Sequence, residues 1–277
     1  MRTLVIAEAG CTHEGSLKAL EAMVDMSAAC GCDVFKSQWV SDPAALCERR
    51  GAHDYRPYYE FLKFPAAWHG TLAARCAARG IQYASTVYLP VDVAVIDPHV
   101  ALYKVAAFEA EADDLLEAYA EVMQRNRKDL YVSVAMGAEW RPSFPPEAAG
   151  RVFALRCVSA YPTPPEQLNL GTIRDYGFVG LSDHTRPDNV LTGALAVAAG
   201  ARVIERHIRL DSCKPSNPDF AVAMSEHGLS AYVENIRQAE TAMGVDRGPQ
   251  PAEAPMAAYR VTRRKRKPEP EGGGDGA

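Results

Sequence analysis

The sequence has no apolar run long enough to cross a membrane, and its cysteines do not form the pattern of a disulfide-bonded scaffold. Charged residues interrupt every apolar segment well before the roughly 20 residues that a membrane-spanning helix needs. The seven cysteines are odd in number and scattered through 277 residues, which favours free thiols in a reducing compartment. The N-terminus also lacks the apolar core and cleavage site of a signal peptide. We therefore expect a cytoplasmic protein that does not enter a membrane.

Clustered basic charge is scarce outside the C-terminus. Between Arg260 and Ala277 six basic residues accompany three acidic ones, whereas the whole chain has a formal net charge of −5. An acidic body argues against nucleic-acid binding by the folded part, because phosphate backbones attract clusters of Lys and Arg. Residues 245–277 are rich in Pro and Gly and few in number, so we predict a disordered, solubilising tail.

What the chain has in abundance is one repeated unit, a short apolar run followed by a loop and an Ala-rich amphipathic segment. There are eight such runs, and helical patterns follow at roughly 17–30, 66–79, 91–97, 113–126, 166–175, 188–199 and 226–243. Apolar strands that alternate with helices predict parallel strands buried on both faces. Eight units in about 250 residues predict an α/β fold, a (β/α)8 TIM barrel over residues 1–244.

Two segments depart from the repeat. The residues between Met136 and Arg151 include three prolines and show no convincing helical face, so a degenerate fifth helix is predicted there. Residues 40–65 are predicted to form a long loop, and their aromatic side chains suit a lid over the site: Tyr55, Tyr58, Tyr59 and Phe61.

Polar side chains follow all eight predicted strands. In a (β/α)8 enzyme the C-terminal ends of the strands form the active site. The candidates at these ends are Glu8, Lys36, Gln38, Ser85, Thr86, Lys104, Glu109, Ser133, Ser159, Tyr161, Ser182, Asp183, His184, Glu205 and His207. One such Lys alone is more often part of an ion pair than catalytic, and one such Ser often only caps the following helix. Their presence at every strand end favours a functional site.

The strongest pair is His184 in "GLSDHT" and His207 in "VIERHI". Their strands are expected to be neighbours, so the side chains can meet across a ladder spacing of about 4.8 Å. Two imidazoles with Glu205 and Asp183 nearby suit a divalent metal ion. The alternative is that both histidines are satisfied residues of the core.

Lys36 and Lys104 point to an anion in the same site. Two ammonium groups facing one pocket repel each other unless something anionic lies between them. Hydroxyl groups of Ser133, Ser159 and Ser182 could complete a phosphate or carboxylate site. A metal on one side and cations on the other suggest a small phosphorylated acid that reacts with a carbonyl compound.

The order and spacing of several segments resemble the N-acetylneuraminate (sialic acid) synthase family from about Leu4 to Gly244. These segments are "IAEAGCTHEGSL", "FKSQ", "AST", "YKVAAFE", "CVSAYPTP", "GLSDHT", "VIERHIRLD" and "NPDF". Members of that family are (β/α)8 enzymes that condense phosphoenolpyruvate with an open-chain N-acylated hexose such as N-acetylmannosamine. The resemblance thus implies a transferase of carbohydrate biosynthesis and is compatible with a homodimer.

The resemblance also implies roles for individual residues. His184 and His207 correspond to the ligands of a divalent metal, normally manganese. Glu8, Glu205 and Asp219 correspond to the acids near the aldehyde and the metal-bound water. The expected phosphoenolpyruvate-binding residues are Lys36, Lys104, Ser133 and Ser182, joined by Ser159 from its place at a strand end. The expected residues for the second substrate are Gln38, Glu109 and Tyr161, joined by Thr86 from its strand end.

The chain departs from the family pattern after several strands, including Ser133-Val134-Ala135 in place of Ser-Thr-Gly. Ala107-Phe108 replaces a Ser-Gly pair, Val87-Tyr88 replaces Pro-Phe, and the family's C-terminal antifreeze-like domain has no counterpart in the sequence. These departures leave the acceptor sugar open. Two alternatives remain, a Schiff-base aldolase that uses Lys104 and a non-catalytic relative that binds an acid or a sugar.

Overall fold

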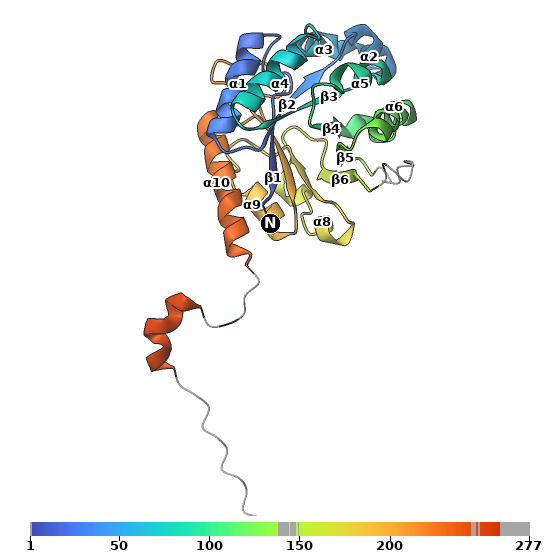
Figure 1. Cartoon of the computed structure of the whole chain (residues 1–277). Coiled ribbons are helices and arrows are strands. Elements are labelled where there is room, and N and C mark those ends of the chain that lie inside the picture. Colours follow the sequence, from blue (N-terminus) through green and yellow to red (C-terminus); the bar gives the residue numbers. More distant parts are fainter. Residues whose placement is uncertain are drawn as a thin grey trace, which may run out of the picture. The chain divides into compact units, whose positions relative to one another are not determined.

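A computed structural model of the chain describes residues 2–137, 144, 148, 150–244, 248 and 250–260. Contacts within the chain divide it into two units, Met1–Met243 and Gly244–Ala277. The first unit contains a closed barrel of eight parallel strands in chain order, with helices outside it (Figure 1). This arrangement confirms the predicted (β/α)8 fold.

Each strand of the barrel pairs with the next, and the last closes on the first. The strands are β1 Leu4–Glu8, β2 Val34–Trp39, β3 Gln82–Val87, β4 Leu102–Val105, β5 Leu130–Val134, β6 Val152–Cys157, β7 Gly180–Asp183 and β8 Val203–His207. Closure places Leu4 opposite Val203 and Glu8 opposite His207. Because all strands are parallel, their C-terminal ends meet at one end of the barrel.

Most predicted helices are present within a few residues of their expected bounds. The α-helices of the first unit are α1 Leu17–Ala29, α2 Pro43–Arg50, α3 Arg56–Leu62, α4 Trp68–Ala78, α5 Pro90–Ile96, α6 Asp113–Arg125, α8 Thr172–Asp175, α9 Thr192–Ala198 and α10 Glu226–Ala242, with 3₁₀ turns η1 His53–Tyr55, η2 Ala107–Glu109 and η3 Pro165–Gln167. The helix predicted at 166–175 was wrong in extent. A proline-led 3₁₀ turn and a four-residue helix occupy this segment, and Asn169, whose φ of 49° is incompatible with a continuous helix, lies between them.

The prediction of a long loop over residues 40–65 was wrong. Asp42 caps α2 by accepting hydrogen bonds from the amides of Ala44 and Ala45, and Pro43 occupies its first turn. Gly51, with φ of 59°, ends this helix in the left-handed conformation. The segment therefore forms α2, η1 and α3, and presents its aromatic side chains from short helices.

Two other predictions fall largely outside the described residues. Most of the predicted degenerate fifth helix lies at residues 138–143, 145–147 and 149, which the structure does not describe. In the second unit, η4 Pro251–Tyr259 is a 3₁₀ helix whose side chains are all exposed. The disorder predicted for the rest of the tail stays a prediction.

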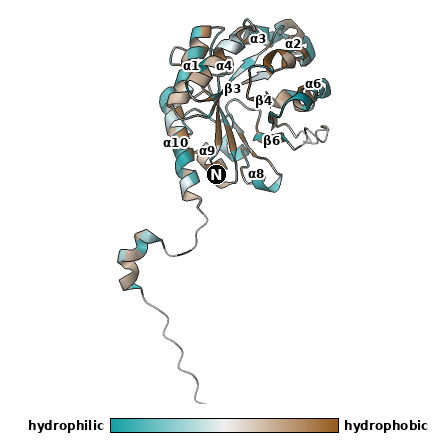
Figure 2. Cartoon of the chain, viewed as in Figure 1, coloured by the Kyte–Doolittle hydropathy of each residue, from teal (hydrophilic) through white to brown (hydrophobic). Residues whose placement is uncertain are grey.

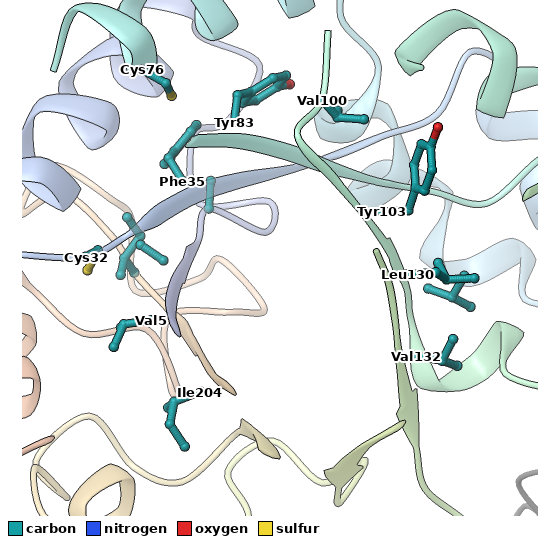
Figure 3. Close-up of a cluster of buried hydrophobic side chains, with 14 of the residues drawn as sticks. Val5, Cys32, Phe35, Cys76, Tyr83, Val100, Tyr103, Leu130, Val132 and Ile204 are labelled. Carbon is teal, nitrogen blue, oxygen red and sulfur yellow. The ribbon is translucent and has the colours of Figure 1, made fainter. Parts of the chain in front are cut away.

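The apolar core lies around the outside of the barrel wall. It also fills the part of the interior nearer the N-terminal ends of the strands. Figure 2 shows hydrophobic residues concentrated on the strands, and Figure 3 shows several of them pointing outward from the barrel toward the helices. A separate apolar cluster fills the interior, formed by Ile6, Val34, Ala84, Leu102, Tyr131, Leu155 and Val203. Apolar side chains thus fill the barrel interior next to the end that carries the polar residues.

Gly180 provides a test of this packing. A Cβ atom there would lie 1.8 Å from the carbonyl oxygen of Val203 on the neighbouring strand, so Gly180→Ala forces the two strands apart. We expect the free energy of unfolding to fall by about 3 kcal/mol, measured by urea denaturation. Gly171→Ala is the matched control, since φ there is −53° and no atom lies within 4 Å of the new Cβ. Equal midpoints for both variants would contradict this account of Gly180.

Candidate active site

The apolar interior predicts directly which side chains form the site. Successive side chains of a strand alternate between faces, so the residue two positions beyond each interior residue also points inward. Applied to the seven interior residues and Gly180, this step gives Glu8, Lys36, Thr86, Lys104, Ser133, Cys157, Ser182 and Glu205. All eight are buried, and together they form a polar layer directly above the apolar one.

Glu205 lies at the centre of this layer. Its Oε1 accepts a hydrogen bond from Ser182 Oγ at 2.8 Å and lies 3.6 Å from Lys104 Nζ. Its Oε2 lies 3.6 Å from Lys36 Nζ. Burial alone would raise the pKa of Glu205, but the two ammonium groups outweigh it and lower this pKa to about 2. Glu205 is therefore a carboxylate at neutral pH.

The two lysines are held in different ways. Lys104 Nζ donates to Ser133 Oγ at 2.7 Å and to the carbonyl of Val105 at 2.9 Å. Lys36 Nζ donates to Thr86 Oγ1 at 2.8 Å and contacts the carboxylate of Glu8. Burial, together with repulsion from Lys104, lowers the pKa of Lys36 to about 7. An anion bound between these lysines would reverse part of that shift.

The two histidines lie next to each other at the ends of β7 and β8. Their ring centroids are 5.2 Å apart. The carbonyl of Val158 lies 3.0 Å from His184 Nδ1, which must therefore donate, and this leaves Nε2 beside Tyr161 Oη at 3.2 Å. His207 Nδ1 lies 3.7 Å from Asp219 Oδ2. Burial would raise the pKa of Asp219, but His207 is the main cause that lowers it below its usual range.

The donor set fits a divalent metal in part. Imidazole nitrogens and carboxylate oxygens suit ions such as manganese, iron and zinc. His207 Nδ1 is buried and has no hydrogen-bond partner among the residues that the structure describes. A Cβ on Gly10 would lie 2.1 Å from Asp219 and 3.0 Å from His207, so only glycine leaves room for this pair. The described residues contain no cluster of three or more His, Cys, Asp or Glu suited to a metal, and an ion on the two histidines would keep open positions.

The site continues outward into a larger cavity. An inner cavity of about 40 Å³ is lined by the lysines, the histidines and Glu205. An outer cavity of about 980 Å³ adds Glu109, Asp219 and the side chains of α2, η1 and α3. The two cavities share Gln38, Phe108, Ser159 and Tyr161. Small groups therefore fit the inner part, and the outer part has room for a sugar.

The structure brings most of the predicted residues to this site, but the predictions for Ser85 and Asp183 were wrong. Both point outward from the barrel, where Ser85 accepts a hydrogen bond from Ser37 and Asp183 pairs with Arg206 and Tyr232. The inner cavity is lined by Lys36, Gln38, Thr86, Lys104, Ser133, Ser159, Tyr161, Ser182, His184, Glu205 and His207, while Glu109 and Asp219 line the outer one. Glu8 reaches the site through its contact with Lys36. Their individual roles stay predictions.

Sequence reasoning missed other residues of the site. Cys157 lies in the inner cavity, with its Sγ 3.7 Å from His184 Nδ1. Its position two residues beyond the interior Leu155 would have revealed it. Arg49 and Arg50 line the outer cavity from the end of α2. No sequence signal placed them at the site, because the segment that holds them was predicted to be a loop.

Fold and site together define the class of protein. A (β/α)8 barrel with a buried Lys–Glu–Lys cluster beside two histidines is an enzyme framework for an anionic substrate. The model of the NeuB family matches residues 23–247, so the chain belongs to the NeuB family. It is accordingly an enzyme of the sialic acid synthase type, a transferase of the class that condenses phosphoenolpyruvate with sugars.

Individual relatives agree with this assignment. The chain is 30% identical over 268 residues to pseudaminic acid synthase of Campylobacter jejuni, covering 88% of this chain and 75% of that protein. It is 25% identical to human N-acetylneuraminate-9-phosphate synthase, over 87% and 71% of the two chains. The crystal structure of N-acetylneuraminic acid synthetase from Leptospira borgpetersenii superposes with a TM-score of 0.77 at 23% identity, covering 96% of this chain and 94% of that one. This last similarity supports the fold alone.

The described helices carry one more finding. None of them combines the length and the apolar character that crossing a membrane requires. The predicted cytoplasmic location and the homodimer stay predictions.

The low pKa of Lys36 leads to a test of anion binding. At pH 8 a lysine with a pKa of about 7 is mostly neutral, and a bound phosphate group would raise its pKa and draw in a proton. We expect phosphoenolpyruvate binding at pH 8 to take up as much as about one proton, and less at pH 6, where Lys36 is already charged. Calorimetry in buffers of different ionisation enthalpy measures this uptake. Lys36→Met should abolish it, and an unchanged uptake in that variant would assign the proton to another group.

Proposed function

We propose that this enzyme catalyses the metal-dependent condensation of phosphoenolpyruvate with an aldehyde, an open-chain sugar or a sugar-like compound. The products would be a 3-deoxy-2-ulosonic acid, similar to sialic acid, and inorganic phosphate. One observation carries the proposal: Lys36 and Lys104 lie in the same small cavity as His184 and His207. An anionic substrate and a polarised carbonyl can therefore be held within reach of each other.

Phosphoenolpyruvate would bind on the lysine side of the inner cavity. Lys36 and Lys104 supply positive charge, and the hydroxyls of Ser133 and Ser182 supply further hydrogen bonds. Because these groups are fixed before the substrate arrives, they can stabilise charge on the leaving phosphate without reorganising.

The aldehyde would bind on the histidine side. His184 and His207 would hold a divalent ion, normally manganese in this family, which when bound supplies Lewis-acid polarisation of the aldehyde oxygen. The Val158 carbonyl fixes the tautomer of His184, while the Asp219 carboxylate lies 3.7 Å from His207 Nδ1 and leaves that nitrogen without a hydrogen bond. The contact to Val158 therefore sets the orientation of the His184 ring before an ion binds.

The bond changes then balance. The methylene carbon of phosphoenolpyruvate forms a bond to the aldehyde carbon, and the aldehyde oxygen becomes a hydroxyl by gaining a proton. Water adds at the carbon that carries the phosphate, and the bond from that carbon to the phosphate oxygen breaks. The hydroxyl that the water adds passes its proton to the phosphate as the ketone forms, and the other proton of the water balances the one gained by the aldehyde oxygen. Glu205 is ionised and buried at the centre of the cavity, so it is suited to orient this water as a hydrogen-bond acceptor.

Phosphate release is the direct test of the proposal. The purified chain would be mixed with phosphoenolpyruvate, manganese and a panel of N-acylated and simple aldoses, with the chelated enzyme as a control. We expect release that needs both an aldose and the metal. Release without an aldose, or none with any aldose, would contradict the proposal. A substrate trapped on Lys104 by borohydride would favour a Schiff-base aldolase, although Lys104 already donates to two oxygens.

A histidine variant tests the metal site without relying on activity. His207→Ala removes one of two imidazole ligands, so the affinity for manganese should fall by more than about 100-fold. Thermal unfolding should change little, since only the end of β8 is altered. His227→Ala on the exposed face of α10 is the matched control and should bind manganese normally. Loss of folding with manganese affinity retained would mean that His207 is a core residue.

A further inference from the structure

Arg50, at the end of α2, forms an ion pair that organises one wall of the outer cavity. Its Nε and Nη2 atoms lie 2.8 and 2.5 Å from the same oxygen of Glu109, Oε1. The Glu109 side chain is only 3% exposed and that of Arg50 18%. Because both N–H groups go to one oxygen, the pair is oriented rather than only neutralised.

This geometry leaves the second oxygen of Glu109 for a ligand. Oε2 is buried and has no hydrogen-bond partner among the described residues, and Glu109 is one of the residues that line the outer cavity. A buried carboxylate oxygen without a donor is unfavourable, so a donor from a bound molecule would satisfy it. Burial raises the pKa of Glu109, and Arg50 opposes that rise and favours the ionised form. Arg50 therefore opposes protonation of the Glu109 carboxylate.

The same guanidinium group supports a second polar residue. Its central carbon lies 4.8 Å from the ring centroid of Tyr88 and 5.1 Å from that of Phe108. Tyr88 in turn donates its hydroxyl hydrogen to Oε1 of Gln38. The amide oxygen of Gln38 is thereby used, and its NH2 group remains a donor for the cavity. Arg50 thus connects an acceptor on Glu109 with a donor on Gln38.

We propose that Arg50 is a positioning residue that determines which acceptor the enzyme takes. It holds Glu109 and, through Tyr88, Gln38, so that the wall offers one hydrogen-bond acceptor and one donor beside aromatic rings. This pattern is complementary to an N-acylamino group, with one N–H and one C=O, and it would also accept two adjacent hydroxyls. The inference rests on the proposed function, since it assigns the outer cavity to the aldehyde.

Arg49 offers a matched control on the same helix. It lines the same cavity, but its Nη1 and Nη2 atoms lie 2.6 and 2.5 Å from Asp114, whose side chain is 56% exposed. Removing Arg49 therefore changes the charge of the cavity by the same amount without touching Glu109 or Tyr88. A general loss of positive charge would affect both variants equally, whereas a positioning role is specific to Arg50.

The test measures the binding of unreactive alcohols, so it does not depend on turnover. N-acetylmannosaminitol and mannitol would be titrated by calorimetry into the wild type, Arg50→Ala and Arg49→Ala, with manganese and phosphoenolpyruvate present. We expect Arg50→Ala to weaken N-acetylmannosaminitol at least 10-fold and Arg49→Ala less than 3-fold. Phosphoenolpyruvate affinity should be the same in all three proteins.

Two further variants keep the test decisive if Arg50→Ala does not fold. Arg50→Lys keeps the charge but cannot make both contacts to Oε1, so an intermediate loss is expected. Tyr88→Phe keeps the ring below the guanidinium group and removes only the hydrogen bond to Gln38, with an expected loss of about 3- to 10-fold.

The outcomes separate the two proposals. Equal effects of Arg50→Ala and Arg49→Ala, or no binding of either alcohol by the wild type, would overturn the role of Arg50. Equal binding of both alcohols would identify adjacent hydroxyls rather than the amide as the recognised group. Arg50-dependent binding without any phosphate release would retain this site and reject the condensation reaction.

Discussion

The carboxylate of Glu205, ionised between two buried ammonium groups, is the interaction on which the inner site depends. Lys36 and Lys104 are each 2% exposed, and a buried charge is tolerated only when it is paired and hydrogen-bonded. With Glu8 added and Lys36 protonated, the cluster contains two cations and two anions. A phosphorylated acid alone would make it negative, so a divalent cation on the nearby histidines would restore the balance. Under the proposed function, binding of the metal and binding of the anion would therefore be coupled.

The outward-facing side chains of the same strands hold the histidines in place. Arg206 lies between Glu205 and His207 in sequence but points away from the cavity, where it is fully buried. Its Nη1 lies 2.9 Å from Asp183 Oδ1, and its Nη2 donates to the carbonyl of Thr185 at 2.9 Å. These contacts fix the backbone on both sides of His184. Strand β8 thus carries Glu205 and His207 on its inward face. On its outward face it carries Arg206, which supports the backbone around His184.

The sequence was sufficient to predict the barrel and the inner site, because both follow from the alternation of side chains along buried strands. The positions of Lys36 and Lys104 at strand ends are enough to place both side chains in the site. Arg50 could not be found in this way. Its role depends on meeting Glu109, which is 59 residues away, and on a helix that begins at Pro43 in a segment predicted to be a loop. Chemical roles, unlike positions, cannot be derived from periodicity at all.

The contacts of Arg50 also explain why the departures from the family pattern occur together. Phe108 replaces a glycine and Tyr88 a phenylalanine, and these two rings lie 5.1 and 4.8 Å from the Arg50 guanidinium carbon. Removing either ring would weaken the support of the cation, and removing the cation would leave the Glu109 carboxylate buried without its counter-charge. The changes are therefore parts of one arrangement on the acceptor side of the site. The histidine pair keeps the family pattern, so under the proposed function these departures would bear mainly on the molecule that reacts with phosphoenolpyruvate.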